Sequence, residues 1–235
     1  MRLLVFAFLL AALAGYDPAR AQATTPEPRL VVKDVWLLKG GFPPKREPDG
    51  NTVIFRAPEG LIVLDTGRHS GHQEAIVPIE ASQRMIIGGR VLDVRLAPDA
   101  ATAGDVWLYD PKARVAAVGD LVTLPAPFLD TACPAGWRRA LGEIWATPFQ
   151  IALPGHGPPL TRASFAAWRS AFDALMDCSA SAKPKEACAA AWVEGVRPLL
   201  DSGQLALDRA TGMTQDYVGL LRANGGKSPF CQAAG

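Results

Sequence analysis

The sequence has no large excess of charge and lacks several motifs that mark common binding and catalytic sites. Its 24 Lys and Arg nearly balance 23 Asp and Glu, so no basic surface for nucleic acid is indicated. The nucleophile elbow G-x-S-x-G is absent. No two of the four cysteines have the C-x2-C or C-x4-C spacing of a structural zinc site. These absences argue against a nucleic-acid-binding protein, a serine hydrolase of the elbow type and a zinc-finger domain.

The sequence also lacks an apolar run long enough to span a bilayer. The run Leu3–Ala14 is shorter than the about 20 residues that a transmembrane helix requires. It follows Arg2 and precedes Ala21-Gln22-Ala23, a pattern typical of a secretory signal peptide. We therefore predict a signal peptide over residues 1–23, a periplasmic or secreted chain that begins near Thr24, and no membrane association after cleavage. The alternative is an uncleaved N-terminal anchor.

The four cysteines can form disulfides in an exported chain. Cys178 and Cys188 flank a polar segment between two predicted helices, and we predict that they pair. Cys133 and Cys231 would then pair by elimination. Residues 24–235 are long enough for a single domain, with a C-terminal helical extension from about residue 177.

Two similar hairpins organise the middle of the chain. Their strands are predicted over Thr52–Arg56, Leu61–Leu64, Asp105–Tyr109 and Arg114–Val118. The first hairpin ends at Asp65 and the second at Asp120, each beside a glycine. Nearly continuous apolar strands indicate burial on both faces of a sheet, and the repeat predicts two similar halves. The two aspartates should then lie on the same edge of a sandwich.

The remaining elements complete an α/β architecture. Further strands are predicted over Leu30–Leu38 and on both sides of Gly88-Gly89, and helices over Gly136–Trp145, Thr161–Met176, Glu186–Leu200 and Thr214–Arg222. Sheets inside, helices outside and two similar halves predict a four-layer αββα sandwich.

The stretch Ile151–Gly157, IALPGHG, places His156 on a turn at the end of an apolar strand. The strand fixes the backbone of a histidine in this position and leaves its side chain accessible, as a metal ligand or a proton-transfer group requires. The alternative is a Pro-Gly turn whose histidine is merely solvated. The partners that the rest of the chain supplies decide between the two.

The ordered set LDTG (Leu64–Gly67), VGD (Val118–Asp120) and PGHG (Pro154–Gly157), followed by a helix, resembles the metallo-β-lactamase fold hydrolases. The resemblance covers roughly residues 30–175. It implies that Asp120 bridges two metal ions and that His156 binds the second one. It also implies that Asp65 supports the ligands without binding metal itself.

The sequence departs from the family pattern in the first half. The family's H-x-H-x-D-H loop is missing, and the chain has only three histidines, His69, His72 and His156. Ala101 stands where the family carries a further histidine ligand before the second hairpin. The interval from Gly67 to Arg84 is too short for the elements that normally fill it, so we predict a truncated first half.

His69 and His72 have two interpretations. Residues at i and i+3 share a helix face, so either could move in as a substitute ligand beside Asp120 and His156. The alternative is a place at the rim of the site, because Gly67 and Gly71 indicate a turn.

The resemblance implies zinc-dependent hydrolysis of an ester, thioester or amide in a small-molecule substrate. A catalytic zinc needs about three protein ligands, so we predict impaired activity. The alternative is a non-catalytic, degenerate relative that keeps the sandwich for binding.

Overall fold

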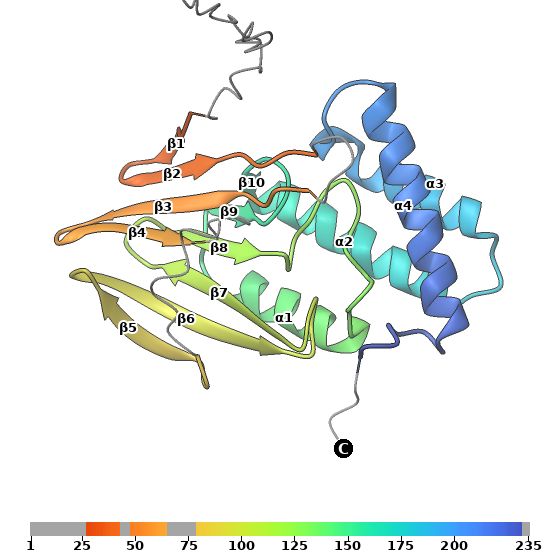
Figure 1. Cartoon of the computed structure of the whole chain (residues 1–235), viewed down its shortest axis with the longest axis horizontal. Coiled ribbons are helices and arrows are strands. Elements are labelled where there is room, and N and C mark those ends of the chain that lie inside the picture. The colour runs from red at the N-terminus through yellow and green to blue at the C-terminus, as the bar shows by residue number, and fades with distance from the viewer. Residues whose placement is uncertain (1–26, 43–47, 65–78, 232–235) are drawn as a thin grey trace, which may run out of the picture.

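A computed structural model describes residues 27–42, 48–64 and 79–231 (Figure 1). Its strands form two sheets. The first has the order β1-β2-β3-β4, with β1 (Arg29–Val32), β2 (Val35–Leu38), β3 (Thr52–Ala57) and β4 (Gly60–Leu64). The second has the order β10-β9-β8-β7-β6-β5, with β5 (Gln83–Ile87), β6 (Arg90–Pro98), β7 (Gly104–Asp110), β8 (Val115–Gly119), β9 (Ile151–Pro154) and β10 (Leu160–Thr161).

The two sheets pack face to face around an apolar core. In β3, Val53 and Phe55 point inward and are almost fully buried, as side chains two residues apart on a strand should be. They share one cluster with Leu92 of β6 and Leu153 of β9. The predicted α/β sandwich of two packed sheets is therefore confirmed, and both predicted hairpins are present as β3–β4 and β7–β8. Of its predicted outer helical layers, the described residues show the one against the second sheet.

The helices of the described residues lie on the side of the second sheet (Figure 1). They are α1 (Pro134–Ala146), α2 (Arg162–Ser179), α3 (Lys185–Val196), the 3₁₀ turn η1 (Arg197–Leu199) and α4 (Gln204–Ala223). Helices α1 and α2 cover the second sheet, and α3 and α4 pack against α2. None of the helices in the described residues is long and apolar enough to cross a membrane. On the opposite side, the first sheet turns Leu61 and Val63 toward solvent, 65% and 46% exposed.

Two predicted elements were wrong in their extent. Leu30–Leu38 is a hairpin rather than one strand, because Lys33 and Asp34 form a tight turn in which Asp34 has φ of 65°. Aspartate tolerates this left-handed conformation better than most residues, but without a Gly or Pro the turn is hard to predict. The last helix begins at Gln204, ten residues before the predicted Thr214.

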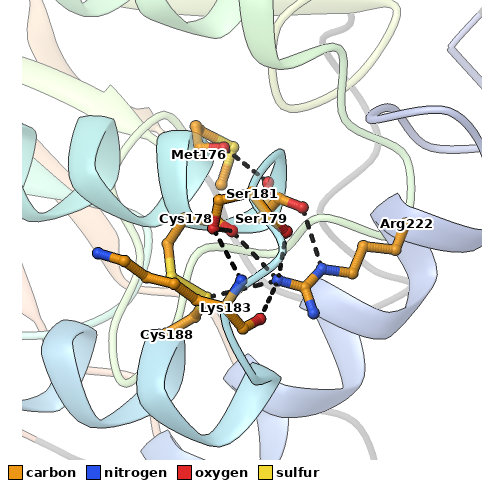
Figure 2. The surroundings of a disulfide bond; sticks show 7 residues. All are labelled: Met176, Cys178, Ser179, Ser181, Lys183, Cys188 and Arg222. Carbon is orange, nitrogen blue, oxygen red and sulfur yellow. Dashed lines mark hydrogen bonds between the residues drawn. A yellow bond between two sulfur atoms is a disulfide. The ribbon is translucent and has the colours of Figure 1, made fainter.

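Both predicted disulfides are present. Cys178–Cys188 joins the end of α2 to α3, and Cys133–Cys231 ties the start of α1 to the C-terminal segment. Figure 2 shows that Arg222 of α4 reaches the α2–α3 turn beside the first disulfide. Its guanidinium donates to the carbonyl oxygens of Ser179 at 3.0 Å and Lys183 at 2.7 Å, among others. The disulfide ties α2 to α3, and the Arg222 guanidinium fixes α4 to the turn between them.

Candidate metal centre

Asp120 and His156 meet at the carboxyl ends of two neighbouring parallel strands. Strands β8 and β9 pair in parallel, with Gly119 opposite Pro154, so the residues that follow them emerge at the same edge of the sheet. The His156 Nε2 and Asp120 Oδ1 atoms are 3.6 Å apart. His156 is 6% exposed, whereas the side chain of Asp120 is 44% exposed. The two residues thus form a pair in which His156 is buried and Asp120 is partly exposed.

Gly155 makes room for this pair. A Cβ atom at position 155 would lie 2.0 Å from Asp120 Oδ1, which is far inside van der Waals contact. The Gly155 amide also donates to the Gly119 carbonyl at 2.7 Å, which ties the two strand ends together. Only glycine permits this approach.

Three buried tryptophans hold the loop that follows Asp120. Each belongs to a different helix, and each indole N–H donates to a loop carbonyl at 2.9–3.0 Å. The pairs are Trp137 with Leu121, Trp168 with Thr123, and Trp192 with Pro125. Buried indole groups normally find a partner of this kind, and here the partners fix the loop backbone. The sequence predicted Trp137 and Trp168 only as apolar helix positions.

Asn51 holds the loop that carries His156, a role that the sequence does not predict. Its side-chain amide donates to the carbonyl oxygens of Pro154 and Gly157, both at 2.9 Å, and accepts from the Gly40 amide at 3.0 Å. Asn51 is 2% exposed. In the sequence it stands just before a strand and has no distinguishing pattern, so no local signal could have identified it.

His156 also lines a pocket of about 240 Å³ between the loop edge of the sandwich and the C-terminal helices. Phe128 packs against its imidazole with ring centroids 4.9 Å apart, and Phe42 lies at 6.0 Å. The rest of the pocket comes from the β2–β3 loop, the segment after β8, η1 and the start of α4. His156 therefore joins the strand-end pair to a binding-sized cavity.

Comparison with known proteins gives a consistent answer for the fold. No family model matches the sequence, and no curated protein matches it either. The metallo-β-lactamase from Pontibacter korlensis is 16% identical, with 63% of this chain and 98% of that chain covered and a TM-score of 0.52. DIM-1 metallo-β-lactamase is 13% identical, with 63% and 96% covered and a TM-score of 0.50. The chain has the metallo-β-lactamase fold.

Of the remaining predicted site residues in this metallo-β-lactamase fold, the structure describes only some. Asp65, His69 and His72 lie outside the described residues. Ala101, which the sequence resemblance predicts at the position of a family histidine, is 2% exposed and packs in the core. Nearby, the Thr102 amide donates to Asp105 at 2.8 Å, while burial raises the pKa of the Asp105 carboxyl. This segment is built for packing rather than for metal.

The donor pair fits zinc in chemistry and spacing but is incomplete among the described residues. Imidazole nitrogen and carboxylate oxygen are both zinc ligands, and two donors on a tetrahedral zinc lie about 3.3 Å apart. The observed 3.6 Å is close to that separation. Within residues 27–42, 48–64 and 79–231, no group of three or more His, Cys, Asp or Glu side chains could hold a metal. The described residues supply two of the about three ligands that a catalytic zinc requires.

Proposed function

We propose that this chain is a metallo-hydrolase of the metallo-β-lactamase type with a reduced zinc site. Asp120 and His156 are two of its ligands, and His69 or His72 supplies the third. The observation that carries the proposal is the 3.6 Å separation between His156 Nε2 and Asp120 Oδ1 at the end of paired strands. Asp65 supports the ligands without binding the metal itself.

The proposed reaction is hydrolysis of an ester, thioester or amide in a small molecule. Zinc, when bound, lowers the pKa of a coordinated water to about 7 and so supplies a nucleophile at neutral pH. The protein's own part is to hold two donors rigidly through Gly155 and Asn51 and to offer a partly apolar pocket beside them. Because the proposed site has fewer zinc ligands than the full set of the family, we expect slow turnover.

Metal content tests the proposal directly. The full chain, equilibrated with excess zinc and then desalted, should retain about one zinc per chain, as a site with three protein ligands would. His156→Ala and Asp120→Asn should each abolish retention, whereas Glu143→Gln, which alters an exposed carboxylate of α1, should not. The measurement is inductively coupled plasma mass spectrometry, with circular dichroism to confirm folding. A well-folded chain that retains no zinc contradicts the proposal.

A second function has its own supporting observation. Ala101 is buried where a family ligand would stand, and the described residues contain no three-ligand group. A non-catalytic relative that keeps the sandwich for binding accounts for both. It predicts that the folded, zinc-equilibrated chain does not hydrolyse p-nitrophenyl acetate above the rate of the His156→Ala variant.

We also propose that the protein works outside the cytoplasm as a single domain spanning residues 24–235, after removal of residues 1–23. The two disulfides support this, because such bonds persist in oxidising compartments. The mass of the mature chain recovered from the periplasm or medium should place its N-terminus near Thr24.

A further inference from the structure

We propose that the pocket beside His156 binds a small carboxylate with an apolar body, and that Arg209 of α4 receives the carboxylate. The residues that line the pocket are of two kinds. Three are charged, Lys39, Asp201 and Arg209, and the apolar ones include Leu124, Pro125, Leu199, Leu200 and Leu205. A cavity with one polar anchor and an apolar surround is the usual design of a small-molecule site.

Only one of the charged groups is available for a ligand. Lys39 Nζ contacts Asp201 Oδ1 at 2.8 Å, so these two charges offset each other. Among the described residues, Arg209 forms no ion pair, which leaves the pocket with one positive charge in excess. A monoanion matches this balance better than a phosphate dianion.

The guanidinium of Arg209 lies over an aromatic ring. It stacks over the ring of Phe42, with Cζ 4.6 Å from the centroid. Stacking occupies the face of a guanidinium and leaves its in-plane N–H donors open, and these match the two oxygens of a carboxylate. Phe42 also lies 6.0 Å from the His156 ring, so the anchor and the strand-end pair share one aromatic neighbour.

The apolar lining residues favour a ligand with an apolar body. Leu205, at the start of α4, is 70% exposed although it lines the pocket. An alkyl or aryl group would cover this side chain and gain from its burial. The cavity of about 240 Å³ is smaller than the sites of about 300–1,000 Å³ that hold drug-sized molecules, which favours a compact ligand.

Hexanoate is a suitable probe, with neutral hexanamide as its uncharged counterpart. Both are titrated into the full, metal-free chain with its disulfides intact, and dissociation constants are measured by nuclear magnetic resonance. We expect hexanoate to bind at least about tenfold more tightly than hexanamide, as a charged hydrogen bond should allow. Arg209→Gln should weaken hexanoate by about tenfold, and Arg209→Lys should recover part of the loss.

The double variant Lys39→Gln/Asp201→Asn is the matched control, because it removes one positive and one negative charge from the same pocket and leaves the excess charge of Arg209 unchanged. It should change hexanoate affinity by less than about threefold. Absence of hexanoate binding, equal binding of hexanamide, or an unchanged Arg209→Gln variant each overturns the inference. An equal loss in the double variant overturns the assignment to Arg209. The assay contains no metal, so its outcome is independent of zinc retention.

Discussion

The two sheets of the sandwich differ in how their outer faces are covered. The outer face of the second sheet lies under helices, with Trp137 and Trp168 fully buried against it. In the described residues, the first sheet instead turns Leu61 and Val63 to solvent. Asp120 and His156 both follow strands of the second sheet. The part of the candidate site that the structure describes therefore stands on the well-covered sheet.

This difference separates the rigidity of a site from its completeness. The strand ends that carry Asp120 and His156 are fixed by indole N–H groups, a buried asparagine and a glycine contact. The sequence lacks the H-x-H-x-D-H loop, which supplies the ligands of the first half in the family that it resembles. The proposed metal site would therefore combine a rigid support with an incomplete ligand set.

The largest expected effect comes from removing a tryptophan under the covered sheet. Trp168→Ala deletes a fully buried indole and its bond to the Thr123 carbonyl, and should lower the free energy of unfolding by about 4–5 kcal/mol. Trp36→Ala is the control in the first sheet. Trp36 is only partly buried, so its loss should cost at most about 1.5 kcal/mol. Urea unfolding measures both, and equal losses would remove the contrast between the two sheets.

The next effect concerns a buried ion pair within the second sheet, whose arginine also reaches the first sheet. Arg90 of β6 donates to Asp110 at 2.7 Å and also contacts the carbonyl oxygen of Arg56 in β3. Both side chains of the pair are buried, so Asp110→Asn leaves a charge without compensation and should cost about 3 kcal/mol. Lys39→Gln breaks the exposed pair with Asp201 and should cost under about 1 kcal/mol. Similar losses in the two variants would contradict this prediction.

The sequence allows the sheets, most helices and the strand-end positions of Asp120 and His156 to be predicted, because each rests on local periodicity or punctuation. The supporting contacts are different in kind. Asn51 binds residues more than one hundred positions away, and the role of Gly155 depends on how closely β8 and β9 approach. Such contacts exist only once distant segments have packed, so no local pattern encodes them. The hairpin turn at Lys33 and Asp34 was missed because it contains neither Gly nor Pro.

Asn51→Ala tests whether the site depends on this non-local support. It removes three hydrogen bonds and leaves the Pro154 and Gly157 carbonyls without their side-chain donor, at an expected cost of about 2 kcal/mol. The imidazole resonances of His156 should shift as the loop relaxes. Asn224→Ala, which removes one half-buried bond at the end of α4, should cost under about 1 kcal/mol and leave those resonances unchanged. Unchanged resonances in Asn51→Ala would show that the conformation of the His156 loop does not depend on the Asn51 side chain.

The smallest effect is a pH dependence in the second sheet. Burial raises the pKa of Asp105, so the folded chain binds this proton more tightly than the unfolded chain. Its stabilising contribution is therefore present at low pH and is lost as the pH rises above the unfolded pKa of about 3.9. As the pH rises from about 4 to about 6, the free energy of unfolding should fall less for Asp105→Asn than for the wild type. Urea unfolding at each pH measures this difference.

Asp93→Asn provides the opposite sign in the neighbouring strand. The hydrogen bond from Arg84, at 2.6 Å, lowers the pKa of Asp93, so its contribution is present above the unfolded pKa and is lost as the pH falls. This variant should be less stable than the wild type at neutral pH and approach it in acid. If the two variants show the same pH dependence, burial and pairing do not have the opposing effects on stability that their pKa shifts require.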